Sequence, residues 1–161
     1  MIRAILAVVV ASLVCSGSAV AQKPSQAVRD SATVQDCIKT KGGVHDKWES
    51  CIGVVSNPCL KDEASMPTST VNACISREQV VWEDILNETF RRLREKLDDT
   101  QRDKLRDMQR AWITSREKTC TFYWDFFQGT MASPMSANCM NREAARRALF
   151  LLGFLNDVEG K

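Results

Sequence analysis

The chemistry open to this chain depends first on its cysteines, of which there are seven. No two of them form a Cys-x-x-Cys pair, so the local pattern of a thioredoxin-like redox site is missing. Zinc ligands normally come in pairs two to four residues apart, whereas the closest pair here is Cys51 and Cys59. The cysteines therefore predict structural disulfides, with no metal site and no cofactor site.

Other catalytic groups are scarce. The single histidine, His45, lies just after Gly42 and Gly43 in a predicted turn, and its one nearby acid is its chain neighbour Asp46. A catalytic histidine needs a nucleophile or an orienting carboxylate close to it in space, so we interpret His45 as an exposed turn residue. No serine lies in a Gly-x-Ser-x-Gly turn, and the seven glycines are too scattered for a phosphate-binding loop. The sequence predicts a non-enzymatic protein.

The composition is that of an ordinary globular domain. The 161 residues are 44% hydrophobic and 26% charged, which excludes wholesale disorder. Lys and Arg number 22 against 20 Asp and Glu, a net charge of +2. This balance favours neither nucleic acid nor an anionic membrane surface as a partner. A protein partner is expected, and the oligomeric state is left open.

Residues 1–21 are typical of a cleavable export signal. Ala4–Val14 is an apolar run too short to span a bilayer, and Ala19-Val20-Ala21 matches a signal-peptidase site, which predicts cleavage after Ala21. Lipid attachment at Cys15 is the alternative, but Val14 stands where a small residue is usual. We therefore expect a periplasmic protein, with six of the seven cysteines in the mature chain of an oxidising compartment.

The spacing of apolar residues in the remaining chain predicts helices and no strand. The expected helices are 28–41, 46–57, 71–97, about 101–126 and about 139–159, with loops at 61–70 and 129–138. Asp46 is expected to cap the second helix and Pro58 to end it. The predicted fold class is all-α: a disulfide-stapled helical bundle with a long antiparallel helix pair, a closing helix and short N-terminal helices. We divide the chain into a signal peptide (1–21), a cysteine-containing extension (22–70) and a helical domain (71–161), the last two forming one compact unit.

The predicted turns indicate how the six mature cysteines pair. Fifteen connectivities are possible, and cysteine spacing by itself does not choose among them. Turns at Gly42-Gly43, near Pro67 and at 129–138 each bring two flanking cysteines together. We therefore predict three bridges, each worth about 3 kcal/mol in the loop-entropy model. They are Cys37–Cys51, Cys59–Cys74 and Cys120–Cys139.

A dense aromatic group ends the second long helix. Its members are Phe122, Tyr123, Trp124, Phe126 and Phe127. Phe122, Tyr123 and Phe126 continue the apolar stripe of that helix and are expected in the core. Because the group covers more of the helix circumference than one stripe needs, Trp124 or Phe127 is expected to be partly exposed. Core packing is the leading interpretation of the group, and a surface for a partner or ligand is the alternative.

One dense basic spot lies on the first long helix, at Arg91, Arg92, Arg94 and Lys96. Acids such as Glu88 and Glu95 stand three or four residues from these arginines. The leading interpretation is a solvated face of intrahelical ion pairs. A docking patch for another protein is the alternative.

A set of motif residues extends along both long helices and the closing one: Cys74, Glu78, Trp82, Leu86-Asn87, Phe90, Leu93, Leu97, then Gln109-Arg110-Ala111-Trp112, Arg116-Glu117 and Cys120, then Cys139-Met140 and Arg147. This pattern, over residues 71–155, resembles the lysozyme-inhibitor LprI-like family of exported bacterial domains. Cys51-Ile52-Gly53 through Cys59 resembles its cysteine-extended subgroup. The family more often has Asp where this chain has Glu117, and Thr where it has Ala144.

The resemblance implies an exported helical domain with a disulfide between Cys120 and Cys139, and its named activity is inhibition of lysozyme. The motif residues are interpreted as scaffold. Trp112 belongs to the helical stripe, and Arg116 is expected to tie down the loop that follows Cys120.

The lead hypothesis is therefore a non-enzymatic periplasmic binding module, with a lysozyme as the partner that the family name suggests. A nearly neutral chain offers little electrostatic steering toward basic lysozymes. An inhibitor would then insert the stapled 129–138 loop, with Met131 and Met135, and act by shape. The aromatic end of the second long helix is the other surface expected to take part. The alternative is a structural or envelope-stress accessory protein that binds another protein through Arg91, Arg92 and Arg94.

Overall fold

The computed structural model describes residues 24–41 and 45–160. The predicted signal peptide, its cleavage site and the Gly42-Gly43 turn lie outside these residues. In chain order the elements are α1 (Gln26–Thr40), α2 (His45–Trp48), η1 (Glu49–Cys51), α3 (Ser56–Cys59), η2 (Glu63–Ser65), α4 (Thr68–Lys96), α5 (Asp99–Phe126), η3 (Gly129–Met131) and α6 (Ala132–Glu159). The predicted all-α class is confirmed. In the described part of the chain, no helix is long and apolar enough to cross a membrane.

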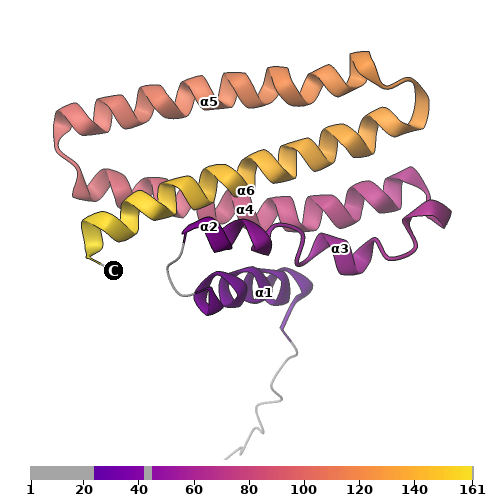
Figure 1. Cartoon of the computed structure of the whole chain (residues 1–161), viewed down its shortest axis with the longest axis horizontal. Coiled ribbons are helices and arrows are strands. Elements are labelled where there is room, and N and C mark those ends of the chain that lie inside the picture. Colours follow the sequence, from indigo (N-terminus) through magenta and orange to yellow (C-terminus); the bar gives the residue numbers. More distant parts are fainter. Residues whose placement is uncertain (1–23, 42–44, 161) are drawn as a thin grey trace, which may run out of the picture.

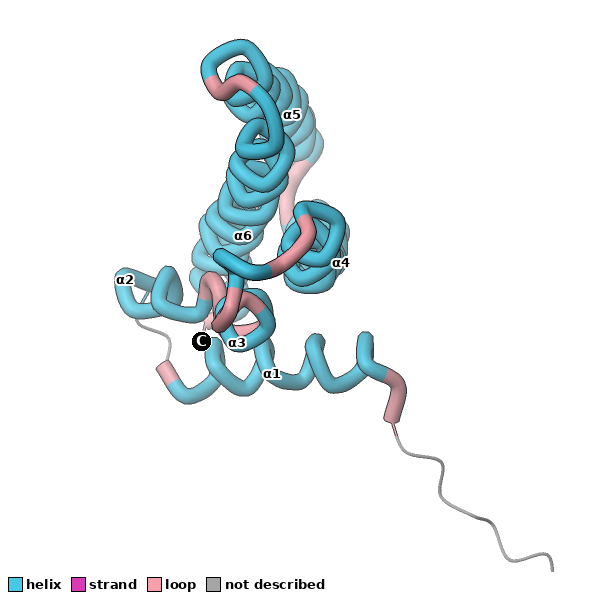
Figure 2. The backbone as a smooth tube through the Cα atoms, turned by 90° about the vertical axis from the view of Figure 1, so that its right-hand side faces the viewer, coloured by secondary structure: helices cyan, strands magenta, loops and turns pink. Residues whose placement is uncertain are grey.

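Three long helices form the body of the structure (Figure 1). The chain reverses between α4 and α5 and again between α5 and α6, so α4 and α5 run antiparallel as predicted. α6 packs against both of them, and α1 lies on the far side of α6 from α5 (Figure 2). α5 is consequently covered along one face only, where Leu105, Gln109 and Cys120 are buried.

The segment after α1 differs from the single helix that we predicted. The chain forms α2, η1 and α3, separated by a turn at 52–55. Asp46 lies inside α2 and is not its cap, and Pro58 lies within the single turn of α3 rather than after it. The cause is Gly53, whose φ of 100° strains any residue with a side chain. Its turn directs backbone N–H groups toward a buried carboxylate on α4.

The closing helix begins at Ala132 rather than near Cys139, so the predicted 129–138 loop is mostly helical. Gly129, at a φ of 73°, makes the corner after α5. Pro134 had suggested a loop, but it lies in the first turn of α6, where its missing N–H removes no intrahelical hydrogen bond. No long loop is available at this end to insert into an enzyme cleft.

Two apolar clusters hold the long helices together. The smaller one lies near the α4–α5 turn and consists of Leu93, Leu105, Leu151 and Leu155. The larger one joins the N-terminal elements to α4 and α6 and consists of Val34, Trp48, Cys51, Val55, Val81, Trp82, Leu86, Ala144, Ala145, Ala148 and Leu149. Residues of the N-terminal extension thus share a core with the long helices.

All three predicted disulfides are present. The S–S distances are 2.01 Å for Cys37–Cys51, 1.90 Å for Cys59–Cys74 and 2.03 Å for Cys120–Cys139. The first ties α1 to η1, the second ties α3 to α4, and the third ties the end of α5 to α6. The bridges therefore fix the N-terminal elements and the α5–α6 corner to the same body.

Candidate functional site

A buried glutamate organises the junction between the N-terminal segments and α4. Glu78 is fully buried, and its Oε1 accepts hydrogen bonds from the Gly53 N–H at 2.6 Å and the Trp82 indole N–H at 3.0 Å. Its Oε2 accepts from the N–H groups of Val55 and Ser56 at 2.9 and 2.8 Å, and from Ser56 Oγ at 3.1 Å. The 52–55 turn is therefore built around this carboxylate.

The protonation state of Glu78 follows from these contacts. Burial raises the pKa of the Glu78 carboxyl, but the N–H groups of Ser56, Gly53 and Val55 and the Trp82 indole lower it. The net pKa lies below the usual value for glutamate. Glu78 is thus a charged anion at neutral pH whose oxygens are occupied by scaffold donors. This arrangement suits a structural role better than proton transfer.

The motif residues of α5 and α6 form a stacked cluster around Trp112. The Arg116 guanidinium lies 4.5 Å from the centre of the Trp112 ring, and that of Arg147 lies 5.6 Å from it. Arg147 Nε donates to Gln109 Oε1 at 2.8 Å. Arg116 also pairs with Glu83 of α4. The prediction that Arg116 ties down the following loop is wrong, because its side chain reaches across to α4.

Arg147 is a buried cation without a carboxylate partner in the described residues. Burial lowers the pKa of its guanidinium, and its Nη2 makes no hydrogen bond. The rings of Trp112 and Phe150 lie beside it, at 5.6 and 5.2 Å from ring centre to guanidinium. The aromatic faces offset part of the cost of burying the charge. The motif therefore joins three helices and does not form an open site.

A surface of a different kind occupies the end of α5. We call Phe122, Trp124, Phe126 and Phe127 the aromatic tip. Phe122, Trp124 and Phe126 are exposed by 58%, 53% and 65%, and Phe127 is partly buried. The expected exposure at Trp124 and Phe127 is confirmed. The expected core positions of Phe122 and Phe126 are wrong, because α6 covers only the opposite face of α5.

The two methionines of the predicted loop lie in different surroundings. Met131 is exposed and lines a cavity of about 430 Å³ beside Met66. Met135 is partly buried in α6 and lines a separate cavity of about 240 Å³ with Tyr123 and Arg142. The structure therefore does not bring Met131 and Met135 together in one inserting loop.

Two of the four residues in the basic spot of α4 form ion pairs. Arg91 contacts Glu88 at 2.7 Å and Glu95 at 2.5 Å, which confirms the predicted intrahelical pairing. Arg92 reaches Glu159 of α6 at 2.6 Å. Arg94 lies over the Phe90 ring at 5.9 Å and has no carboxylate partner among the described residues. Arg94 and Lys96 are thus the two residues of the basic spot that form no ion pair among the described residues.

No group of three or more His, Cys, Asp or Glu side chains in the described part of the chain is placed to hold a metal ion. His45 is the first residue of α2, and its side chain is not among those described.

The hydrogen-bond network of Glu78 and the burial of Arg147 were not predicted from the sequence. The burial of Glu78 could have been predicted, because Glu78 lies on the same helical face as Val71, Ile75 and Trp82. An ionised side chain on a buried face requires several donors. The sequence did not indicate that the 52–55 turn supplies them.

One protein-family model, described as Lysozyme inhibitor LprI, matches residues 59–151. The matched residues include Glu78, the cluster around Trp112 and the aromatic tip. No curated protein and no solved structure matches the chain.

Proposed function

Because this chain belongs to the LprI family, which matches more than half of its length, we propose that it is an exported, non-enzymatic protein-binding module that inhibits a lysozyme through its aromatic tip. Phe122, Trp124 and Phe126 are all exposed in the last two turns of α5, and this exposure is the observation that supports the surface. Large aromatic side chains dominate the energy of protein interfaces, and monomeric proteins rarely leave several of them together in water.

The rings of the tip are also partly fixed before any partner arrives. Phe126 packs against Phe122 and Phe127 with ring centres 5.9 and 5.0 Å away, and Phe127 stacks on Tyr123 at 5.8 Å. The Cys120–Cys139 bridge fixes the last turns of α5 to α6. Such preorganisation reduces the entropy lost when the rings enter a partner's cleft.

The charge around the tip also favours a basic partner. Exposed Asp125 lies between Trp124 and Phe126 in the sequence, and a depression of about 420 Å³ is lined by Glu117, Lys118, Phe122 and Asp125 among others. The predicted loop at 129–138 holds no acid, whereas α5 brings two carboxylates to its aromatic rings. Aromatic anchors with acids around them suit the cleft of a strongly basic enzyme.

Export to the periplasm, with signal cleavage after Ala21, belongs to the same proposal. It is supported by three disulfides, since such bridges persist in oxidising compartments and are rare in reducing ones.

The test is a lysozyme turbidity assay with the purified, oxidised mature protein. We expect inhibition that rises with its concentration. The double substitution Trp124→Ala and Phe126→Ala should weaken inhibition by about tenfold or more, since each ring is a candidate hot spot. Val80→Ala is the matched control, because Val80 is an exposed apolar residue of α4. Absence of inhibition at tens of micromolar wild-type protein would reject the proposal, and unchanged inhibition by the double variant would reject the tip as its surface.

An accessory protein that docks through Arg91, Arg92 and Arg94 is the alternative function. Two of these arginines already pair with carboxylates, so binding through them would first have to break ion pairs. The same assay distinguishes the two surfaces. A triple arginine-to-glutamate variant should inhibit like wild type under the tip proposal, and a pull-down that collapses only in that variant would favour the alternative.

A further inference from the structure

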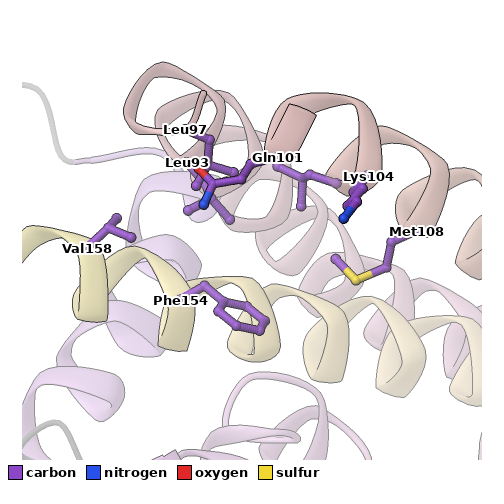
Figure 3. Close-up of a pocket in the computed structure, with 8 residues that line it drawn as sticks. Leu93, Leu97, Gln101, Lys104, Met108, Phe154 and Val158 are labelled. Carbon is purple, nitrogen blue, oxygen red and sulfur yellow. The ribbon is translucent and has the colours of Figure 1, made fainter. Parts of the chain in front are cut away.

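An apolar groove lies at the opposite end of α5 from the aromatic tip. Figure 3 shows the side chains that line it. The groove encloses about 370 Å³ between the end of α4, the start of α5 and the end of α6. Its floor includes the buried side chains of Leu93 and Leu105. Met108 on α5 and Phe154 and Val158 on α6 form its sides. The groove is thus the uncovered edge of the smaller apolar cluster.

The walls of this groove are held in place while remaining open to solvent. Phe154 and Val158 are each 47% exposed. The Phe154 ring packs edge-on against Phe150, with ring centres 5.1 Å apart, and Phe150 lies beside the buried Arg147 guanidinium. A preformed apolar cavity of a few hundred cubic ångströms is the usual form of a small-ligand site.

One charge stands in the groove. Lys104 is the single ionisable residue among those that line it, and it has no carboxylate partner in the described part of the chain. Lys104 and Met108 lie on one side of the groove and Phe154 lies on the other (Figure 3). A ligand that matches this lining has an apolar body and one negative charge at its end.

We infer that the groove binds a free fatty carboxylate, with its alkyl chain along Leu105, Met108 and Phe154 and its carboxylate at Lys104. The single lysine matches one monovalent head group, and the volume lies at the lower end of the range for small ligands. A second copy of the chain fits less well. A stable dimer buries about 800 Å² on each partner. The exposed apolar surface of the groove walls comes from two half-buried side chains, Phe154 and Val158, which provide much less area.

The first experiment measures binding of straight-chain carboxylates with six to twelve carbons to the oxidised mature protein, by calorimetry below their micelle-forming concentrations. Affinity should rise by about fourfold per added methylene until the groove is full, and then level off. Dodecyltrimethylammonium has the same chain with a positive head and should bind more weakly. No binding of dodecanoate at millimolar concentration, or equal binding of the two dodecyl ligands, would overturn the inference.

Variants then test the location. Met108→Trp should fill the groove and weaken dodecanoate binding by about tenfold or more, while Ile113→Trp, at an exposed position on the same helix outside the groove, should not. Lys104→Glu should weaken dodecanoate by about fivefold and improve the cationic ligand. It keeps the apolar lining, so it tests the site even if Met108→Trp folds poorly. Unchanged dodecanoate binding in Lys104→Glu, or a wild-type dimer that Lys104→Glu or Met108→Trp dissociates, would overturn it.

Discussion

Replacing Glu78 by glutamine tests whether the buried carboxylate holds the N-terminal turn to α4. Glutamine keeps one oxygen and turns the other position into a donor. If its oxygen stays near Val55 and Ser56, its NH₂ group faces the Gly53 N–H and the Trp82 indole N–H, which now contact Oε1 at 2.6 and 3.0 Å. The Asn141 amide also donates to Oε1, at 3.4 Å. The two shorter bonds lose an ionised acceptor, each being worth about 1.5–3 kcal/mol. In the opposite amide orientation the N–H groups of Val55 and Ser56 lose their acceptor instead.

We therefore expect Glu78→Gln to lower the free energy of unfolding at pH 7 by roughly 3–5 kcal/mol, a large part of the 5–15 kcal/mol typical of a domain. The assay is urea denaturation of the non-reduced protein, followed by circular dichroism. Glu88→Gln is the control, because Glu88 pairs with Arg91 on the exposed face of the same helix. That variant should unfold at nearly the wild-type urea concentration.

The pH dependence gives the prediction a second, independent readout. The pKa of Glu78 is lower in the folded state than the usual value of 4.5. Its stabilising contribution is therefore complete above about pH 4.5 and is lost as the pH falls through the folded-state pKa. Glutamine does not titrate. The difference in the free energy of unfolding between wild type and Glu78→Gln should therefore become smaller as the pH is lowered from 5 to 2. A difference that stays constant with pH, or no difference at pH 7, would refute the reasoning.

Three further substitutions test other parts of the scaffold. Paired Cys120→Ser and Cys139→Ser substitutions should lower the free energy of unfolding by about 3 kcal/mol in urea titrations, and an unchanged midpoint would show that the corner is held without the bridge. Arg147→Met should cost about 1 kcal/mol, because Gln109 Oε1 loses its buried donor, and adding Gln109→Met should recover most of that loss. Additive losses in this double-mutant cycle would argue against the contact. Asp98→Ala removes the capping box at the start of α5 and should lower the free energy of unfolding by about 1 kcal/mol, measured by thermal unfolding. An unchanged Tm would mean that packing alone determines where α5 begins.

The elements and the disulfides could be predicted from sequence because both depend on local information. Helical spacing located α4 and α5 within a few residues, although α5 begins at Asp99, two residues before the predicted start. Each disulfide joins cysteines 14 to 19 residues apart across one turn, so placing the turns was enough to pair them. Pro134 misled the prediction because proline is compatible with both a loop and the first turn of a helix.

The binding surface was harder to predict, since it depends on what covers each helix. The aromatic residues near the end of α5 suggested that Phe122 and Phe126 continue the stripe of Leu105, but α6 covers the face that carries Leu105 and Cys120. Cys120, at the same end of α5, is fully buried, whereas Phe122 and Phe126 lie away from that face and are exposed. The groove was missed for a similar reason, because periodicity does not show that Phe154 and Val158 of α6 stay exposed opposite the start of α5.

The motif residues, the aromatic tip and the apolar groove lie in different parts of the molecule. Glu78, Trp112 and Arg147 lie within the matched residues 59–151 and contact other parts of this chain, so these three residues have scaffold roles. The aromatic tip also lies within the matched residues, but Phe122, Trp124 and Phe126 are exposed, so substitutions at these three rings should cost little stability. The groove needs Phe154 and Val158, which lie beyond residue 151. Lys104 and Trp124 are also about 30 Å apart along α5 at 1.5 Å per residue. Substitutions at the tip should therefore leave dodecanoate binding unchanged, and Lys104→Glu should leave lysozyme inhibition unchanged, so the two proposals can fail independently.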